Sequence, residues 1–341
     1  MAAMTQAPSL VVRAARASEG AMIARLWREL WDAHENWGGY LGSRDPAVYA
    51  RLAERLDDDA RVRGGHPLIG RHVHLVSEFE GHICGQVEGW LDHHGADRST
   101  PMSCDVRSLI VSADARRAGV GRALLLALAS VARTTAQRLP CVMAAEVLEP
   151  NPARGFYERL GYVPVSWNAR MTALSGLRNA GGLTARLATP ADALSIARLE
   201  TNLATRRRDA GDNRFDRPRA IDATFVDAIA SHLSHGAQDP ATLVATDSTG
   251  AVRGVASFTV HALDPPFVPV RRALVGRFSL DPAGPPLPIL GALVALGCRM
   301  AVTDGAEHVE LTDLSAPKTD LYGCALALGA CPWSRVVTKS A

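Results

Sequence analysis

Hydrophobic residues in the first half of the chain switch between the two-residue spacing of strands and the three- or four-residue spacing of helices. The pattern predicts strands at about 10–15, 104–111, 141–147 and 162–171, with a strand–turn–strand hairpin at 72–91. It predicts helices at 18–32, 47–60, 119–138 and 151–160. This order is typical of an α/β domain, here a mixed, α+β-like central sheet flanked by helices.

The same pattern begins again in the second half. Arg13 and Leu26, at the end of the first strand and within the first helix, have counterparts 173 residues later in Arg186 and Leu199. A second hairpin follows at 242–263. Two matches in the same order predict a duplicated domain.

The repeat defines the expected domains. We expect a first domain at 1–174, a glycine-containing linker without periodicity at 175–182 and a second domain at 183–341. A chain of 341 residues suits two cores better than one. Ser18 and Thr189 stand at the expected N-caps of the first helix in each domain.

Charge and composition exclude several classes. A net charge of +2 gives no reason to expect a nucleic-acid or membrane-surface partner. No apolar run reaches the roughly 18 residues of a membrane span, and the first residues lack the order of a signal peptide, so we expect a cytoplasmic protein. The six cysteines are dispersed, and His72 with His74 is a weak metal pattern, so we expect neither a disulfide framework nor a metal.

A glycine-rich loop suggests an anion site. The apolar strand ending at Val111 leads into Arg116-x-x-Gly119-x-Gly121, and a helix follows from Arg122. Free main-chain N–H groups, the positive end of the helix dipole and nearby arginines attract a pyrophosphate. Alone, the segment also fits a basic start of an ordinary amphipathic helix. It matches neither the P-loop nor the dinucleotide-binding spacing.

A second segment changes that interpretation. About thirty residues on, the chain has an Asn151-Pro152 helix start and the run Phe156-Tyr157-Glu-Arg-Leu-Gly161-Tyr162. The two segments in this order resemble the GNAT superfamily of N-acetyltransferases, over residues 10–171. The resemblance implies an enzyme that uses acetyl-CoA as co-substrate.

The resemblance also implies roles for residues at matching positions. Main-chain groups of the strand end would bind the pantetheine arm, the loop would hold the pyrophosphate, and Asn151 would bond the pantetheine. Tyr157 would protonate the departing thiolate, although a core aromatic is the alternative. The expected cofactor-binding set is Leu109, Ile110, Val111, Arg116, Arg117, Ala118, Gly119, Val120, Gly121, Arg122, Asn151, Arg154 and Tyr157.

The general base is ambiguous in the sequence. Asp105 matches the base position of the histone-acetylating branch, and strand alternation would put it on one face with Arg107 and Leu109. A solvated residue at the strand start is the alternative, and Glu88, Asp92, His93 and His94 are rivals. For the acceptor pocket we expect His34, Glu35, Trp37, Asp92 and His94, with Trp27 and Trp31 facing the core.

The second copy has lost the expected phosphate loop. Its counterpart, residues 278–289, has no arginine and contains several prolines, which lack N–H donors. Tyr322 is the closest counterpart of Tyr157 in the second copy and is expected to have a structural role. We therefore predict acetyl transfer to a primary amine of a small molecule, directly in a ternary complex, by a monomer or homodimer. Acetylation of a protein N-terminus or lysine, and a non-catalytic acetyl-CoA sensor, are the alternatives.

Overall fold

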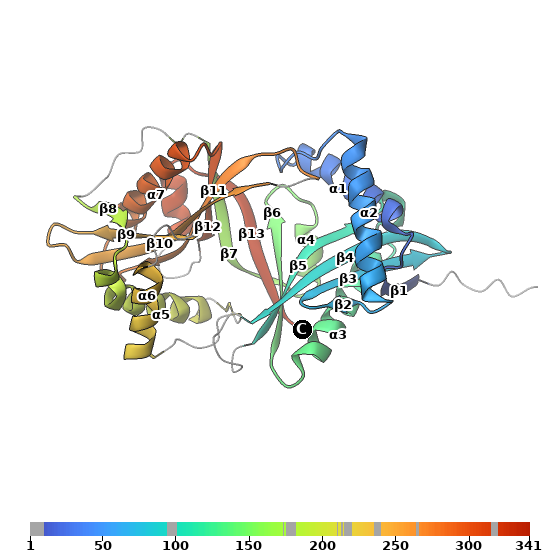
Figure 1. The fold of residues 1–341 in the computed structure, drawn as a ribbon, viewed down its shortest axis with the longest axis horizontal. Coiled ribbons are helices and arrows are strands. Elements are labelled where there is room, and N and C mark those ends of the chain that lie inside the picture. The colour runs from blue at the N-terminus through green and yellow to red at the C-terminus, as the bar shows by residue number, and fades with distance from the viewer. Residues whose placement is uncertain are drawn as a thin grey trace, which may run out of the picture. The chain divides into compact units, whose positions relative to one another are not determined.

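The computed structural model describes residues 10–93, 101–172, 174, 182–209, 211–212, 214, 220–234, 240–263, 266–314 and 320–341. The first copy comprises β1 (Leu10–Ala14), α1 (Gly20–Asn36), α2 (Pro46–Arg63), β2 (Leu68–Ile69), β3 (His72–Phe79), β4 (His82–His93), β5 (Met102–Val111), the short 3₁₀ helix η1 (Ala113–Ala115), α3 (Val120–Ala136), β6 (Cys141–Leu148), α4 (Arg154–Arg159) and β7 (Val163–Met171). The predicted strands and helices are therefore confirmed in kind and order (Figure 1).

The second copy repeats this order. It comprises β8 (Thr184–Leu187), η2 (Pro190–Asp192), α5 (Ala193–Asp209), α6 (Ala223–Ser234), β9 (Ala241–Thr246), β10 (Val252–Ala262), β11 (Arg271–Leu280), α7 (Pro286–Thr303), β12 (His308–Leu314), α8 (Leu321–Ala327) and β13 (Cys331–Ser340). Two copies of one mixed α/β arrangement confirm the predicted fold class.

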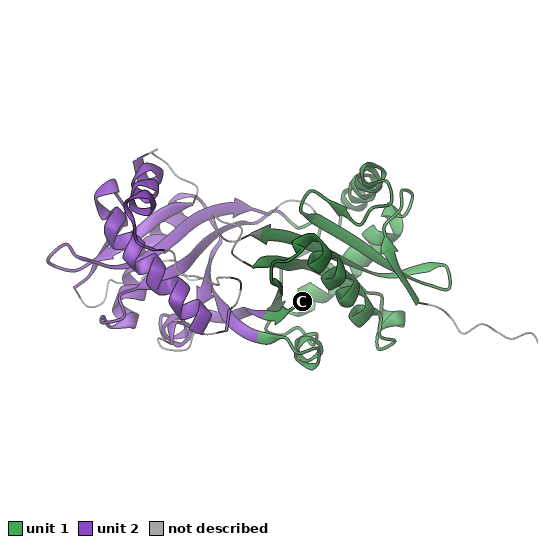
Figure 2. Cartoon of the chain, turned by 90° about the horizontal axis from the view of Figure 1, so that it is seen from below, with its two compact units in different colours: residues 1–163, 264–268, 338–341 green, residues 164–263, 269–337 purple. Residues whose placement is uncertain are grey.

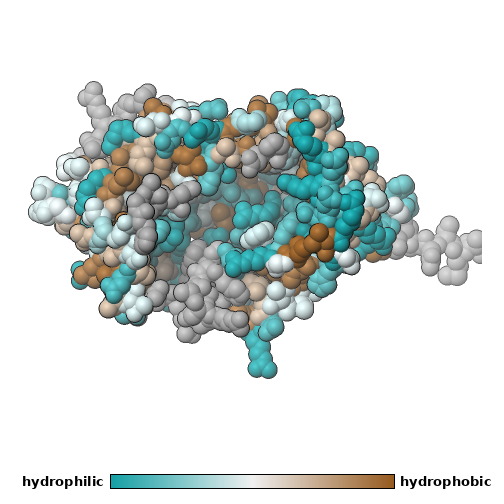
Figure 3. Space-filling model, viewed as in Figure 1, coloured by the Kyte–Doolittle hydropathy of each residue, from teal (hydrophilic) through white to brown (hydrophobic). Residues whose placement is uncertain are grey.

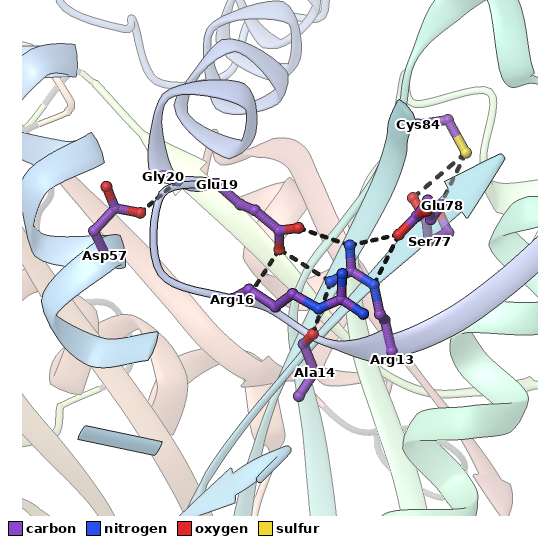
Figure 4. Close-up of polar contacts among 9 residues, drawn as sticks. All are labelled: Arg13, Ala14, Arg16, Glu19, Gly20, Asp57, Ser77, Glu78 and Cys84. Atoms are coloured by element: carbon purple, nitrogen blue, oxygen red, sulfur yellow. Dashed lines mark hydrogen bonds and ion pairs between the residues drawn. The ribbon is translucent and has the colours of Figure 1, made fainter. Parts of the chain in front are cut away.

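The starts of the two copies are held by the same kind of ion pair. Arg13 binds Glu19 at 2.6 Å from Nη2 to Oε1, and it also binds Glu78 (Figure 4). Arg186 binds Asp192 at 2.7 Å, again across six residues. The arginine at the strand end thus fixes the carboxylate at the helix start in both copies, which supports the duplication.

The helix caps differ between the copies. Thr189 forms the expected capping box with Asp192. In the first copy the prediction of Ser18 was wrong: the N-cap of α1 is Glu19, and Ser18 has a left-handed φ of 77°. The Glu19 carboxylate accepts a hydrogen bond from the Arg16 N–H and pairs with Arg13, so the N-cap lies one residue later than expected.

Contacts divide the chain into two units that are not continuous in sequence (Figure 2). Unit 1 is Met1–Val163 with residues 264–268 and Thr338–Ala341, and unit 2 is Pro164–Leu263 with Pro269–Val337. Strand β7, which the sequence placed with the first domain, pairs antiparallel with β12 in unit 2. The end of β13 lies in unit 1, where the Ala341 N–H donates to the Cys141 carbonyl. The expected linker at 175–182 lies outside the described residues except for Gly182.

In unit 1 the strands follow the order β1-β3-β4-β5-β6, antiparallel except for the parallel pair β5–β6. Helices α1 and α2 cover one face, where Ile110 joins their buried cluster with Ile23 and Leu52. Helix α3 covers the other face, where Leu128 packs so closely that a Cβ on Gly89 would lie 2.6 Å from it. The sheet therefore has an α1/α2 face and an α3 face.

In unit 2 the order is β13-β7-β12-β11-β10-β9-β8, where β11 and β12 pair in parallel. Among the described helices, α7 has the length and composition of a membrane span, yet most of its apolar side chains are buried in the core of the unit. On the face of the molecule in Figure 3, hydrophobic residues lie in small groups among polar ones. The burial of α7 therefore fits a core helix.

Candidate functional site

The connection from β5 to α3 forms an anion-binding turn. Gly119 is the N-cap of α3 with φ 83°, and Arg117 adopts φ 70°. From Arg117 to Arg122 no main-chain N–H has an acceptor among the residues that the structure describes. Successive open N–H groups at a helix start form a nest for an anion.

Three arginines add positive charge to this turn. Arg116, Arg117 and Arg122 are exposed, and none forms an ion pair with a described carboxylate. Arg116 donates from Nε to the Val111 carbonyl at 3.2 Å, which holds its side chain along the strand end. Because no acidic group neutralises them, these arginines favour a multiply charged anion such as a pyrophosphate.

Gly121 joins the two sequence motifs in space. A Cβ at Gly121 would lie 3.2 Å from the Phe156 ring, so the first turn of α3 and helix α4 approach each other closely and a larger residue here would crowd the ring. The resemblance had assigned the two motifs to one cofactor. The structure brings them together at the start of α3.

The strands beside this turn separate. β5 and β6 pair in parallel from Met102 with Cys141 to Val106 with Ala145, and both continue beyond that point without further pairing. Apart from the Val111 carbonyl, which accepts from Arg116 Nε, no described strand pairs with the β6-facing edge of β5 over Leu109–Val111. The Ile110 side chain lies in the core under α1, so only its main chain can contribute to binding.

The second motif is held by local contacts. Helix α4 begins at Arg154, three residues later than predicted, because Asn151 and Pro152 form a turn in which the Asn151 Oδ1 accepts from the Ala153 N–H at 2.8 Å. Arg154 pairs with Glu149 at 3.1 Å. Their predicted contacts with the cofactor remain predictions.

Tyr157 is buried between aromatic neighbours. It is 6% exposed and packs edge-to-face with Phe156 and Tyr162. Burial, with a smaller effect of Tyr162, raises the pKa of its phenol, so the hydroxyl stays protonated. No described residue accepts its proton. The side chain is thus both a core aromatic and a hydrogen-bond donor without a partner.

A β-bulge corrects the expected orientation of Asp105. Glu88 pairs with Ser108 and Gly89 with Val106, which leaves Arg107 as the extra residue of β5. Asp105 therefore shares the α1/α2 face with Ser108, whereas Leu109 points to the α3 face. The expectation that Asp105 and Leu109 share a face is wrong. One carboxylate oxygen of Asp105 is buried without a described partner.

A buried polar chain crosses this α1/α2 face at the bulge. The amide oxygen of Gln86 accepts from His74 Nε2 at 2.8 Å, and the Gln86 amide donates to Ser108 Oγ at 3.2 Å. Ser108 donates in turn to Glu88 Oε2 at 3.2 Å, and His72 Nε2 lies 3.9 Å from Glu88 Oε1. Every donor points toward Glu88, which is therefore the terminal acceptor.

The surroundings of Glu88 shift the pKa of its carboxyl. Burial raises the pKa of this carboxyl, although His72 and Ser108 act in the opposite direction. Burial lowers the pKa of His74 to about 4, so that ring is neutral. From the sequence alone, Glu88 is only a rival to Asp105 as the base. The available signal was that polar Gln86 and Glu88 alternate with small or apolar residues along β4.

The predicted acceptor residues separate into different environments. His34 lies 5.2 Å from Trp31 and 5.4 Å from Trp37 between ring centroids, and burial lowers its pKa to about 4. Glu35 forms an ion pair with Arg44. Asp92 pairs with Arg71 at 2.7 Å, and His94 lies outside the described residues. The structure therefore groups only His34 and Trp37, with the core-facing Trp27 and Trp31.

A residue of the second copy joins this aromatic cluster. Phe267, from the β10–β11 connection, belongs to unit 1 and lies 4.2 Å from Trp31. Main-chain bonds hold the segment, because Ser43 N–H donates to the Pro266 carbonyl at 2.7 Å and Val268 N–H donates to the Leu41 carbonyl at 2.9 Å. The indole N–H groups of Trp27 and Trp31 are buried without a described acceptor. The sequence does not predict a role for Phe267, because its contact with Trp31 joins residues far apart in the chain.

The equivalent turn of the second copy, between β11 and α7, has prolines at the helix start and a carboxylate in the turn. Pro285 is the N-cap of α7 and Pro286 its first residue, so neither supplies an N–H. Asp281 accepts from the Ala283 N–H at 3.0 Å, and Arg253 is shared between Asp281 and Asp247. A carboxylate thus occupies the turn where the first copy offers donors. Tyr322 packs beside Trp167, 6.0 Å away between ring centroids.

A comparison with protein families matches part of the first copy. Residues 70–164 match the profile of the "Acetyltransferase (GNAT) domain" family. No curated protein sequence matches the chain.

Three solved structures share the fold. A GCN5-related N-acetyltransferase from Sphaerobacter thermophilus has 16% identity and a TM-score of 0.55 over 97% of this chain and 95% of that one. A tandem GNAT protein from the clavulanic acid biosynthesis pathway has 17% identity and a TM-score of 0.50 over 97% and 98%. A GCN5-related glucosamine N-acetyltransferase region of a fungal multi-domain β-N-acetylglucosaminidase has 11% identity and a TM-score of 0.57 over 98% of this chain and 38% of that one.

Proposed function

We propose that the protein transfers the acetyl group of acetyl-CoA to a primary amine of a small molecule, because residues 70–164 match the GNAT acetyltransferase domain family and the chain shares its fold with a tandem GNAT protein. The observation that carries the proposal is the row of open N–H groups from Arg117 to Arg122 beside three unpaired arginines. The same turn of the second copy contains Asp281 and lacks these donors.

The residues of the first copy fit acetyl-CoA. The turn at Gly119 would hold the pyrophosphate, and the open edge of β5 after Val106 would take the pantetheine arm as an added strand. Acetyl-CoA, when bound, supplies an acetyl group activated as a thioester. Its position beside β5 would place the reacting carbon near the bulge at Arg107, one strand from Glu88.

Both the attack of the amine and the departure of the thiolate require a residue that accepts or donates a proton. An alkyl amine has a pKa near 10.4 and must lose a proton before it attacks. Glu88, the terminal acceptor of the buried chain, would take that proton directly or through water. Asp105 remains a second candidate on the same face. The protonated Tyr157 would donate to the departing sulfur.

The acceptor is proposed from the aromatic cluster. Trp37 and the neutral His34 are partly exposed beside the buried Trp31, and their rings would attract a cationic or apolar amine. Phe267 covers part of this cluster, which favours a small molecule over an extended protein segment.

The decisive experiment measures thiol release from acetyl-CoA across a panel of primary amines and lysine peptides. We expect turnover with a small amine, and we expect Tyr157→Phe to lower kcat roughly 100-fold while the Kd for CoA is unchanged. Binding of CoA without thiol release from any amine would indicate a sensor. Failure of calorimetry to detect CoA binding would refute the proposal.

A further inference from the structure

The second copy contains a cavity where the first copy has its polar chain. The cavity has a volume of about 280 Å³ and lies between α5, α6 and the sheet strands β9, β10 and β11. This approaches the size of sites that hold small molecules.

Strand register shows which positions correspond. Gly85 pairs with Val111 and Gly254 with Leu280, so β4 and β5 match β10 and β11 at one common offset. On this basis Gln86 and Glu88 correspond to Val255 and Ser257. His74, opposite Glu88, corresponds to Thr242, opposite Ser257. The β-bulge of β11 leaves Arg277 as its extra residue, as the bulge of β5 leaves Arg107. Thr242, Val255, Ser257 and Arg277 all line the cavity.

The helix over the cavity is only partly packed, because Ile229 and Leu233 contact the buried cluster below it without being fully buried. Helix α6 is mostly apolar, yet none of its residues is fully buried, and its Phe225, Ile229 and Leu233 line the cavity. Helix α2, at the same place in the first copy, buries Val48 and Leu52. An apolar helix above an unfilled, largely apolar space leaves room for a ligand.

Arg277 and Glu200, which form an ion pair, both line the cavity, and the donors of Arg277 that Glu200 leaves free indicate the class of ligand. Arg277, held at φ 52°, lines the cavity and has a side chain 59% exposed. The Arg277 Nη2 donates a hydrogen bond to Glu200 Oε2 at 2.9 Å. The Nε and Nη1 of Arg277 have no acceptor among the described residues. A guanidinium can keep this bond and bind a second carboxylate through its other donors.

From these observations we infer that the second copy binds a small carboxylic acid with an apolar body, the body under α6 and the carboxylate on Arg277. The site is separate from the acetyl-CoA turn and does not depend on acetyl transfer. The remnant of the duplicated fold is then a ligand-binding domain rather than a packing element alone.

Calorimetry on the full chain with octanoate, 1-octanol and octylamine tests this inference. We expect octanoate to bind one to one with a Kd below about 1 mM, at least tenfold tighter than octylamine. Arg277→Gln should weaken octanoate about tenfold and leave 1-octanol unchanged.

Two tryptophan variants locate the site. Ala228 lies on the exposed side of α6 and lines the cavity, so Ala228→Trp should fill the opening and abolish octanoate binding. The matched Ala223→Trp, at the exposed first residue of the same helix and outside the lining, should bind as wild type. Absence of binding by any probe, tighter binding of octylamine, or undiminished binding by Ala228→Trp would each overturn the inference. If Ala228→Trp does not fold, Arg277→Gln still decides it.

Discussion

The turn after β5 and the turn after β11 occupy equivalent places in two copies of one fold, but they differ in every feature that bears on anion binding. The first has three exposed arginines and open N–H groups from Arg117 to Arg122. The second has two prolines at the helix start and an aspartate that uses the local donors itself. A helix start is therefore a phosphate site only when its donors are left free.

The sheet faces under the first helices show a second contrast. In the first copy a hydrogen-bonded chain from His74 to Glu88 fills the face. In the second copy Thr242, Val255 and Ser257, at the positions of His74, Gln86 and Glu88, line a cavity together with the bulge residue Arg277. A buried carboxylate needs donors that satisfy it, and the second copy has neither a carboxylate nor these donors at the matching positions.

The sharpest test of this contrast is Glu88→Gln. We expect kcat to fall at least roughly 100-fold, because the amide cannot accept a proton from the amine, while the Kd for CoA stays constant. Asp105→Asn is the matched control on the same face and should lower kcat less. A larger loss in Asp105→Asn would assign the base to the residue that the sequence favoured.

The loop contrast is tested by removing charge from each copy. Arg116→Gln combined with Arg122→Gln should raise the Kd for CoA at least roughly 100-fold, since each charge-assisted bond contributes about 1.5–3 kcal/mol. Arg253→Gln is the control in the second copy and should leave that Kd unchanged. Calorimetry at two salt concentrations would show a weaker salt dependence in the double variant. Equal Kd values for the double variant and wild type would place the cofactor elsewhere.

A smaller effect is expected from the segment that the second copy contributes to unit 1. Phe267→Ala should raise the acceptor KM several-fold, because an aromatic pair contributes about 0.5–1.5 kcal/mol, with no change in the Kd for CoA. Val268→Ala, in the same segment but exposed, is the control. An unchanged KM in Phe267→Ala would separate the aromatic cluster from acceptor binding.

The smallest expected effect concerns the feature that the copies share. The hydrogen bond from Arg186 lowers the pKa of Asp192 to about 2, so its stabilisation is present above the unfolded pKa near 3.9 and is lost as the pH falls toward 2. Arg186→Gln should lower the free energy of unfolding by about 1 kcal/mol or less at pH 7, since Arg186 is partly exposed. Urea titrations between pH 5 and pH 2 should show a shallower pH dependence in the variant.

The counterpart in the first copy provides the comparison. Burial alone would raise the pKa of Glu19, but hydrogen bonds from Arg13 and Arg16 lower it overall. Arg13→Gln should therefore change the pH dependence in the same direction. A change of opposite sign in either variant would contradict the shared role of these ion pairs.

Local patterns in the sequence were sufficient for the elements, the repeat and the anion turn. The spacing of apolar residues and the glycines at 119 and 121 act over a few neighbours, and the same short-range forces shape strands, helices and turns in the folded chain. The match of Arg13 with Arg186 indicated the duplication because both arginines belong to the same short local pattern.

Only the tertiary structure decided which side chains meet. One extra residue at Arg107 reverses the alternation of β5, so Asp105 and Leu109 face opposite sides although a simple strand would put them together. The partners of Glu88, the contact of Phe267 with Trp31, and the place of β7 in unit 2 join residues far apart in the chain. Such contacts depend on register and long-range packing, which no local spacing encodes.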